Sequence, residues 1–290
     1  MRYLVFVTLL WAFSFSLIGE YLAGQVDSYF AVLTRVLIAG LVFLPLTRWR
    51  GVSPAFVRGM LLIGALQFGV TYVCLYLSFS VLSVPEVLLF TVLTPLHVTL
   101  IEDVFNRRFN PWALLAALIA VAGAGLIRYE PVGADFYLGF FLLQIANATF
   151  AAGQVCYKHL LARYPSSIAQ HRRFGYFYLG ALAVALPAFL LFGDGSRLPA
   201  TALQWGVLVW LGLAASGLGL YWWNKGAGLV DGGTLAVMNN ALVPAGLLVN
   251  LLLWNRDADL WRLSLGGAVI GASLCLTRLG AAPAAQAVAR

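Results

Sequence analysis

One arginine stands alone in an otherwise membrane-compatible stretch of the sequence. Residues 29–45 read YFAVLTRVLIAGLVFLP, and Arg35 is the only charged residue among them. A guanidinium near the centre of a bilayer costs about 2.5–3.5 kcal/mol even on the mildest scales. Its fork of donors fits a carboxylate in a bidentate arrangement. Arg35 is therefore a candidate either for binding an anionic substrate or for a structural ion-pair network.

Two acidic residues, Glu20 and Glu86, are expected at a depth similar to that of Arg35. All three would lie roughly 3–10 Å inside the same membrane boundary, given the 1.5 Å rise per helical residue. Carboxylates at this depth would partly neutralise the guanidinium. The group predicts either an ion-pair network that fixes helix packing or a substrate site. In the second case Glu86 and Glu20 are also the candidates for proton coupling.

Neutral amide side chains form a second set of candidate binding residues, deeper in the apolar segments. Asn239 and Asn240 stand shortly before Pro244, where we expect a broken helix with amide groups facing a cavity. Amides near the midplane suit a substrate with its own amide-like donors and acceptors. Interhelical hydrogen bonds, worth about 0.6 kcal/mol each, are the alternative. The candidates are the amides Gln144, Asn147, Asn239 and Asn240, together with Tyr178 and Phe90, aromatic residues that would either line an apolar slot or serve packing.

The sequence contains none of the motifs that would indicate an enzyme or an ATP-driven pump. Its three histidines do not have HExxH spacing, and no Walker or GxSxG motif is present. The three cysteines lie in separate apolar runs and predict buried thiols rather than a disulfide or a metal site. We therefore expect no enzymatic activity, no cofactor and no metal. Any energy source would be an ion or substrate gradient.

The elements that must position these residues are set by an unusually apolar composition. Of the 290 residues, 62% are hydrophobic and 10% are charged, whereas soluble domains carry about 25% charged residues. This excludes a water-soluble fold and predicts an all-α membrane protein with lipid as its main partner. The net charge of +7 is spread singly between apolar segments, so it does not indicate nucleic-acid binding.

Ten apolar segments are long enough to cross a bilayer, since about 20 residues are needed. The first of them resembles a signal peptide but lacks a clean cleavage site, so we expect a retained transmembrane helix. Thirteen of the 18 basic residues fall on one side of the resulting topology and four on the other. This asymmetry predicts that both termini are cytoplasmic. The expected spans are 3–22, 29–47, 58–77, 82–101, 111–128, 136–157, 173–193, 203–223, 233–254 and 262–279.

An internal repeat relates the two halves of the sequence. AVAGAGL at 120–126 and AVIGASL at 268–274 match in five of seven positions at an offset of 148, and two glycine pairs follow the same offset. Because each half has five spans, the second half would be inverted, as in many secondary transporters. We expect repeats at 1–130 and 136–280 and a cytoplasmic tail at 281–290. Small-residue stripes favour packing within a monomer, with a weak dimer as the alternative.

The repeat does not place a second arginine opposite Arg35. When the late prolines of the second and seventh spans are aligned, Phe177 stands in the corresponding position. Symmetry alone therefore does not require Arg35, and this asymmetry favours a functional role.

Four long stretches resemble the EamA branch of the drug/metabolite transporter superfamily, and within it a group of bacterial biotin importers. The likeness covers essentially the whole chain and includes the unusual residues Glu20, Arg35, Glu86, Asn239 and Asn240. One departure is Arg108, where the wider family has an acidic residue, although the second half keeps Asp257. The stretches are WAFSFSLIGEYLAGQVDSYFAVLTRV (11–36), EVLLFTVLTPLHVTLIEDV (86–104), LQWGVLVWLGLAASGLG (203–219) and GTLAVMNNALVPAGLLVNL (233–251).

The resemblance implies an inner-membrane protein that imports biotin by alternating access. Arg35 would then hold the biotin carboxylate, aromatic residues the apolar middle, and amides such as Asn147, Asn239 and Asn240 the ureido group. An exporter of amino acids or related metabolites, the commoner EamA activity, remains an alternative. A non-transporting membrane scaffold or sensor is a third possibility, but it leaves the midplane amides without a role.

Overall fold

The computed structural model describes residues 1–105, 107, 111, 115, 119, 134–230, 232–254, 261, 264, 265, 268, 269 and 272. Every secondary-structure element assigned within these ranges is a helix. The expected spans at 111–128 and 262–279 lie outside the described residues apart from isolated positions, as do the tail at 281–290, Arg108 and Asp257.

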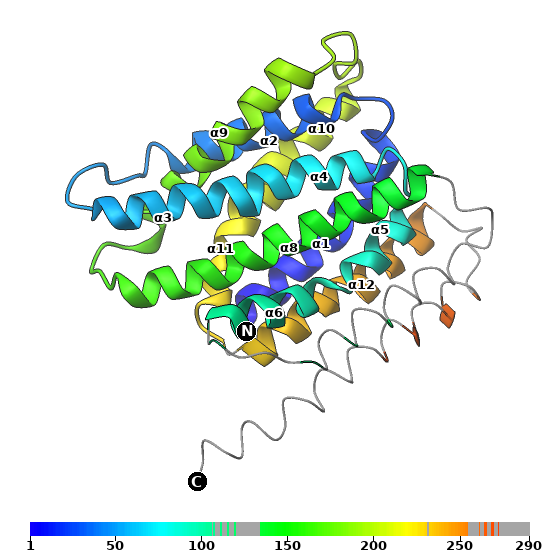
Figure 1. Cartoon of the computed structure of the whole chain (residues 1–290). Helices are drawn as coiled ribbons and strands as arrows, with labels where there is room; N and C mark the ends of the chain where they lie inside the picture. Colours follow the sequence, from blue (N-terminus) through cyan, green and yellow to red (C-terminus); the bar gives the residue numbers. More distant parts are fainter. Residues whose placement is uncertain are drawn as a thin grey trace.

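Eight apolar helical segments in the described ranges match the remaining expected spans. Six of them are long and apolar enough to cross a membrane, and two shorter ones cover Ser28–Phe43 and Met238–Leu253. Figure 1 shows these helices side by side in one bundle. The elements are α1 (Arg2–Tyr21), α2 (Ser28–Phe43), α3 (Pro54–Gly64), η1 (Ala65–Val70), α4 (Thr71–Ser78), α5 (Val84–Thr91), α6 (Thr94–Phe105), α8 (Ala134–Arg163), η2 (Gln170–Arg172), α9 (Gly175–Phe192), α10 (Ala202–Trp210), η3 (Leu211–Gly219), α11 (Leu220–Ala227) and α12 (Gly232–Leu253).

Local sequence signals explain where several of these helices begin. The Asp27 carboxylate caps α2 by accepting a hydrogen bond from the Phe30 amide at 2.7 Å. Ser83 and Glu86 form a capping box at the start of α5, which satisfies two amide donors that the helix itself leaves free. Such caps matter in a membrane protein because the surrounding lipid offers no replacement partners.

Two of the long helices change to π-helical geometry near their middle. The third expected span contains η1 and the eighth contains η3. Each stretch has a glycine at its start where another helix packs closely: Gly64, just before η1, meets the Phe177 carbonyl, and Gly212, the second residue of η3, meets the side chain of Ile38. A Cβ atom at either position would clash. These glycines therefore allow the close helix approaches that stabilise membrane bundles.

The two midspan prolines have different effects on their helices. In the first half the helix stops after Thr91 and restarts at Thr94 as α6, just before Pro95. Proline explains this break because it lacks an amide hydrogen and its ring clashes with the carbonyl four residues earlier. In the second half α12 runs without interruption from Gly232 to Leu253 through Pro244. The expectation of a broken helix at Pro244 was wrong, and the break lies at Pro95 instead.

Helices from the first part of the chain pack against helices from the second part. Helix α9 packs against η1, and α2 packs against η3. Likewise, α1 packs against α12, and α8 packs against α6. The expected spans two and seven also touch each other, as α2 and α9 do.

Candidate functional site

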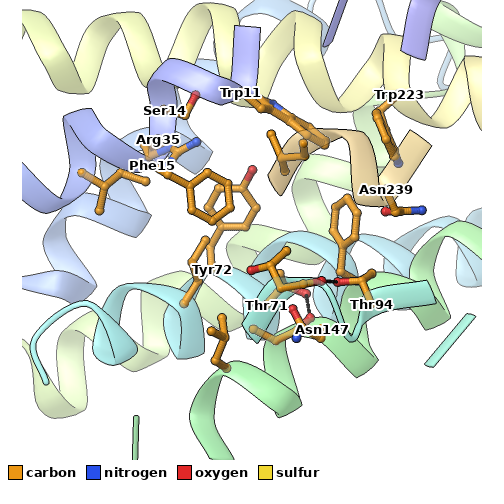
Figure 2. A pocket seen from close by; sticks show the side chains of 17 residues that line it. Trp11, Ser14, Phe15, Arg35, Thr71, Tyr72, Thr94, Asn147, Trp223 and Asn239 are labelled. Carbon is orange, nitrogen blue, oxygen red and sulfur yellow. Dashed lines mark hydrogen bonds between the residues drawn. The ribbon is translucent and has the colours of Figure 1, made fainter. Parts of the chain in front are cut away.

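A cavity lies inside the bundle, and its walls come from helices of both halves (Figure 2). Arg35 lies at one side of the cavity and Asn239 at the opposite side, with the Trp11 ring between them. The lining residues are Trp11, Ser14, Phe15 and Ile18 of α1, Arg35 of α2, Thr71, Tyr72 and Leu75 of α4, Thr91 of α5, Thr94 of α6, Leu143, Ala146, Asn147 and Phe150 of α8, Trp223 of α11, and Asn239 and Leu242 of α12.

Arg35 is held at the cavity wall by neutral partners from both halves of the chain. Its side chain is only 1% exposed. Nε donates to the Ser216 hydroxyl at 2.9 Å, and Nη1 donates to the Tyr76 hydroxyl at 2.9 Å. The guanidinium also lies 4.5 Å from the centre of the Tyr72 ring. These contacts fix the direction of the guanidinium and stabilise it through its cation–π interaction, but they do not neutralise its charge.

The two carboxylates expected beside Arg35 are used elsewhere. Glu20 is exposed near the end of α1, and the Glu86 carboxylate accepts hydrogen bonds from the Ser83 amide and hydroxyl, both at 2.8 Å. Within the described part of the chain, Arg35 forms no ion pair with an acidic residue. The expected ion-pair network is therefore not formed there, because a carboxylate in the first turn of a helix is drawn to the free amides of that turn.

Tyr178 does not line the cavity but stabilises a segment that contacts Arg35. Its hydroxyl donates to the Ser216 carbonyl at 3.0 Å and to the Gly217 carbonyl at 2.9 Å. These carbonyls belong to η3, where π-helical geometry alters the regular hydrogen-bond ladder. Tyr178 thus stabilises the segment that places the Ser216 hydroxyl against Arg35.

Aromatic side chains form the middle of the cavity. The Trp11 and Trp223 ring centres lie 5.0 Å apart, and Phe150 meets Trp11 at 5.8 Å. The Trp11 indole nitrogen donates to the Ala215 carbonyl at 2.9 Å, which ties this ring to η3. Phe90, a sequence candidate for this wall, instead packs in the core against Phe136 and Phe140.

The far side of the cavity carries neutral amides that bond to one another. Asn239 and Gln154 exchange two hydrogen bonds, of 3.1 and 3.3 Å. Trp223 donates its indole N–H to Gln154 at 3.1 Å. Sequence reasoning missed Gln154, although its position on α8, one and two turns after Phe150 and Asn147, places it on the same helix face.

Asn147 completes the amide side, whereas two other amide candidates lie off the cavity. Asn147 is 4% exposed and donates to the Phe90 carbonyl at 3.0 Å. Its neighbour Gln144 accepts a longer bond from it at 3.4 Å but does not line the cavity. Asn240, next to Asn239, also lies outside the lining, and its buried side-chain oxygen has no partner among the described residues.

The geometry favours binding rather than chemistry on a substrate. Among the residues that the structure describes, no cluster of histidine, cysteine or acidic side chains could hold a metal ion. The cavity offers one cation, an apolar middle and neutral amides. Such a site fits an elongated small molecule with an anionic end and a neutral, hydrogen-bonding end.

Comparison with known proteins agrees with a transport role. Residues 2–129 match the EamA-like transporter family. The chain is 73% identical to a probable biotin transporter of Pseudomonas aeruginosa, over 97% of this chain and 98% of the relative. It is 51% identical to the biotin transporter of Escherichia coli K12, over 98% and 94% of the two chains.

One solved structure supports the fold alone. It is titled "Crystal structure of protein", has 20% sequence identity to this chain and aligns over 96% of each chain with a TM-score of 0.67. The apolar helices and the named relatives together indicate a multi-pass membrane transporter rather than an enzyme. By its similarity to these relatives over nearly the full length, the chain belongs to the EamA-like transporter family.

Proposed function

We propose that the protein imports biotin across the bacterial inner membrane as a secondary transporter. The observation that carries this proposal is the cavity itself, in which the Arg35 guanidinium lies across from the neutral amide of Asn239. Relatives at 73% and 51% identity bear the name biotin transporter. Biotin has one carboxylate, an apolar chain and ring, and a neutral ureido group, so its chemistry follows the order of groups in the cavity.

The proposed pose places the biotin carboxylate at Arg35. The guanidinium would then exchange neutral partners for an anionic one, which makes a stronger, charge-assisted hydrogen bond. The valeryl chain and thiophane ring would lie among Trp11, Phe15 and Trp223. Asn147 and Asn239 would receive the ureido group, with one amide as donor and the other as acceptor.

The remaining sequence candidates would act indirectly in this proposal. Tyr178 would act by holding the Ser216 backbone, whose side chain bonds Arg35. Gln144 and the Phe90 carbonyl would act by accepting hydrogen bonds from Asn147. Glu86 and Glu20 remain candidates for proton coupling because they are acidic residues near one end of the bundle, and Asn240 remains a candidate ligand in another conformation.

Alternating access would use two inverted five-helix halves, 1–130 and 136–280, in a ten-helix protein. The π-helical stretches η1 and η3 support this arrangement, because the range of η1 shifted by the 148-residue offset of the sequence falls within η3. The corresponding contacts between helices of the two halves also support it. Both termini would face the cytoplasm, and the working unit would be a monomer or a weak dimer.

Uptake of labelled biotin into cells that lack their own importer tests this function. We expect saturable uptake that unlabelled biotin and desthiobiotin inhibit, whereas biotin methyl ester, which lacks the charge, inhibits poorly. Arg58→Ala is a matched control, because Arg58 is an exposed arginine of α3 that does not line the cavity. Export of an amino acid without any biotin uptake would select the alternative function instead.

A further inference from the structure

A second cavity lies at one end of the bundle, away from Arg35. It forms where the connection between α2 and α3 meets the connection between α8 and α9, at the same end of the molecule (Figure 1). The Arg48 amide donates to the Arg172 carbonyl at 2.7 Å, and the Tyr176 hydroxyl donates to the Arg48 carbonyl at 2.9 Å. These bonds hold the two connections together. The cavity has a volume of about 320 Å³.

Arg173 lines this cavity and is unusually buried for an arginine. Its side chain is 6% exposed, and its guanidinium lies 4.6 Å from the centre of the Phe56 ring. Nη1 donates a long hydrogen bond of 3.4 Å to the Tyr164 carbonyl. Nε is buried and has no hydrogen-bond partner within the described ranges. Burying a charged donor without an acceptor is costly, so Arg173 Nε would gain from an anionic hydrogen-bond partner.

The protein supplies little negative charge to this region. The sequence contains no aspartate or glutamate from position 28 to 85 or from 136 to 193. These ranges include both connections, all of α2, α3 and α9, and α8 from Phe136 onward. Arg163, an exposed residue, adds a second cation to the cavity lining. The described part of the cavity wall therefore carries positive charge without a carboxylate to balance it.

The start of α3 adds a further attraction for an anion. Ser53, the N-cap residue, lines the cavity, and its side chain makes no capping hydrogen bond. Pro54 has no N–H, so the free amides of the first turn of α3 are those of Ala55 and Phe56, which carry partial positive charge. This feature is independent of Arg173, and both act on the same cavity.

We propose that this cavity binds the phosphate of an anionic phospholipid headgroup. The cavity lies where α2 and α8 end and where α3 and α9 begin, which is the level at which a membrane-spanning bundle meets lipid headgroups. Trp49, on the α2–α3 connection, is 57% exposed, and exposed tryptophan is typical of the membrane interface. Basic pockets between membrane helices bind such headgroups in other proteins. Val52 and Phe56 supply an apolar wall, which suits the beginning of the acyl chains.

Purified protein in a neutral detergent tests the proposal. Native mass spectrometry and thermal unfolding would compare short-chain phosphatidylglycerol, phosphatidylcholine with the same chains, and inorganic phosphate. We expect phosphatidylglycerol to bind and to raise the unfolding temperature, while phosphatidylcholine does neither and phosphate acts only at much higher concentration. Arg163→Ala should weaken phosphatidylglycerol binding about fivefold, the effect of one basic residue near a charged surface.

Two further variants make the result decisive. Arg173→Gln should weaken binding at least as much as Arg163→Ala, whereas Arg58→Ala removes an arginine on the neighbouring part of α3 outside the cavity and should change nothing. Equal binding of the two lipids, equal losses for Arg58→Ala and Arg163→Ala, or phosphate as effective as lipid would each overturn the lipid proposal. Biotin uptake is measured separately, so either proposal can fail while the other holds.

Discussion

The two sides of the central cavity differ in how their polar groups are satisfied. At the Arg35 side, a full positive charge meets hydroxyl groups of Tyr76 and Ser216, both at 2.9 Å. At the other side, Asn239 and Gln154 are neutral and satisfy each other's donors and acceptors. At the first side these hydroxyl groups accept from only two of the five guanidinium N–H donors, and they leave the charge unbalanced. At the second side the amides carry no charge and pair with each other.

This difference assigns different tasks to the two sides. An anionic ligand gains electrostatic energy at Arg35 that hydroxyl groups cannot supply, so that side would provide most of the affinity. A neutral ligand group gains only an exchange of comparable hydrogen bonds at the amides, so that side would mainly orient and select. Substitutions at the two sides should therefore differ in how strongly they reduce uptake and in which chemical group of the ligand their effect depends on.

Arg35→Ala should have the largest effect. Truncating one partner of a buried charge pair costs about 2–5 kcal/mol, so the kcat/KM of biotin uptake should fall at least about 30-fold. Arg35→Lys should recover part of it, because the charge remains while the bidentate fork is lost. Initial uptake rates across biotin concentrations measure this, with the unfolding temperature as a check of folding. Normal uptake by a folded Arg35→Ala protein would refute the role of Arg35 in carboxylate binding.

The sequence predicted the helices well but not the partners of Arg35. The length of an apolar segment can be read from the local sequence, and this is why the span expected at 173–193 agrees closely with α9 at Gly175–Phe192. The partners depend on how helices rotate about their axes, which no local pattern encodes. Ser216 lies 181 positions from Arg35 in the chain, and it approaches because η3 packs against α2. The expected depth in the membrane instead suggested Glu20 and Glu86 as the partners of Arg35.

The π-helical stretches were also beyond local sequence reasoning. Gly64 and Gly212 were visible as a repeat pair, but the sequence does not show which helix packs against each of them, α9 through the Phe177 backbone and α2 through the Ile38 side chain. Asn147 and Asn239, selected as polar residues deep in apolar spans, line the cavity, and their contact with a substrate stays a prediction. Tyr178 and Phe90 were not separable from cavity residues, because an aromatic side chain suits a core and a binding slot equally.

Asn147→Ala should have the next largest effect and should respond to a different ligand feature. Loss of one neutral hydrogen bond, about 0.5–1.5 kcal/mol, would raise the KM for biotin roughly 3- to 10-fold. Inhibition by an analogue that keeps the carboxylate but lacks the ureido group should be unchanged in this variant. If that analogue lost as much affinity as biotin, the Asn147 side would not be selecting the ureido group.

Ser216→Ala should separate positioning of Arg35 from binding. Hydrogen bonds to charged groups contribute about 1.5–3 kcal/mol to stability, so the unfolding temperature without ligand should fall. The KM for biotin should change less than about threefold, because Ser216 does not line the cavity. Ser216→Thr keeps the hydroxyl and serves as the conservative variant. A loss of uptake as large as that of Arg35→Ala would mean that Ser216 itself holds the substrate.

Gln67→Met should have the smallest effect on transport, and it tests whether burial of a polar group alone marks a functional residue. Gln67 is fully buried in η1, packs on Gly153, and does not line the cavity. Both polar atoms of its side chain are buried without partners among the described residues. An unsatisfied buried group costs about 1–3 kcal/mol, so an apolar side chain of similar shape should leave stability unchanged or raise it.

Uptake by Gln67→Met should stay within about twofold of the unchanged protein, because the substitution removes no hydrogen bond that the structure makes. Thermal unfolding and biotin uptake on the same preparation check both statements. Arg35 and Gln67 are both buried polar residues, but only Arg35 is oriented by specific partners at a cavity wall. A stable Gln67→Met protein without uptake would show that η1 rearranges during transport and brings Gln67 to the substrate. Gln67 would then be a functional residue like Arg35, although it does not line the cavity in this structure.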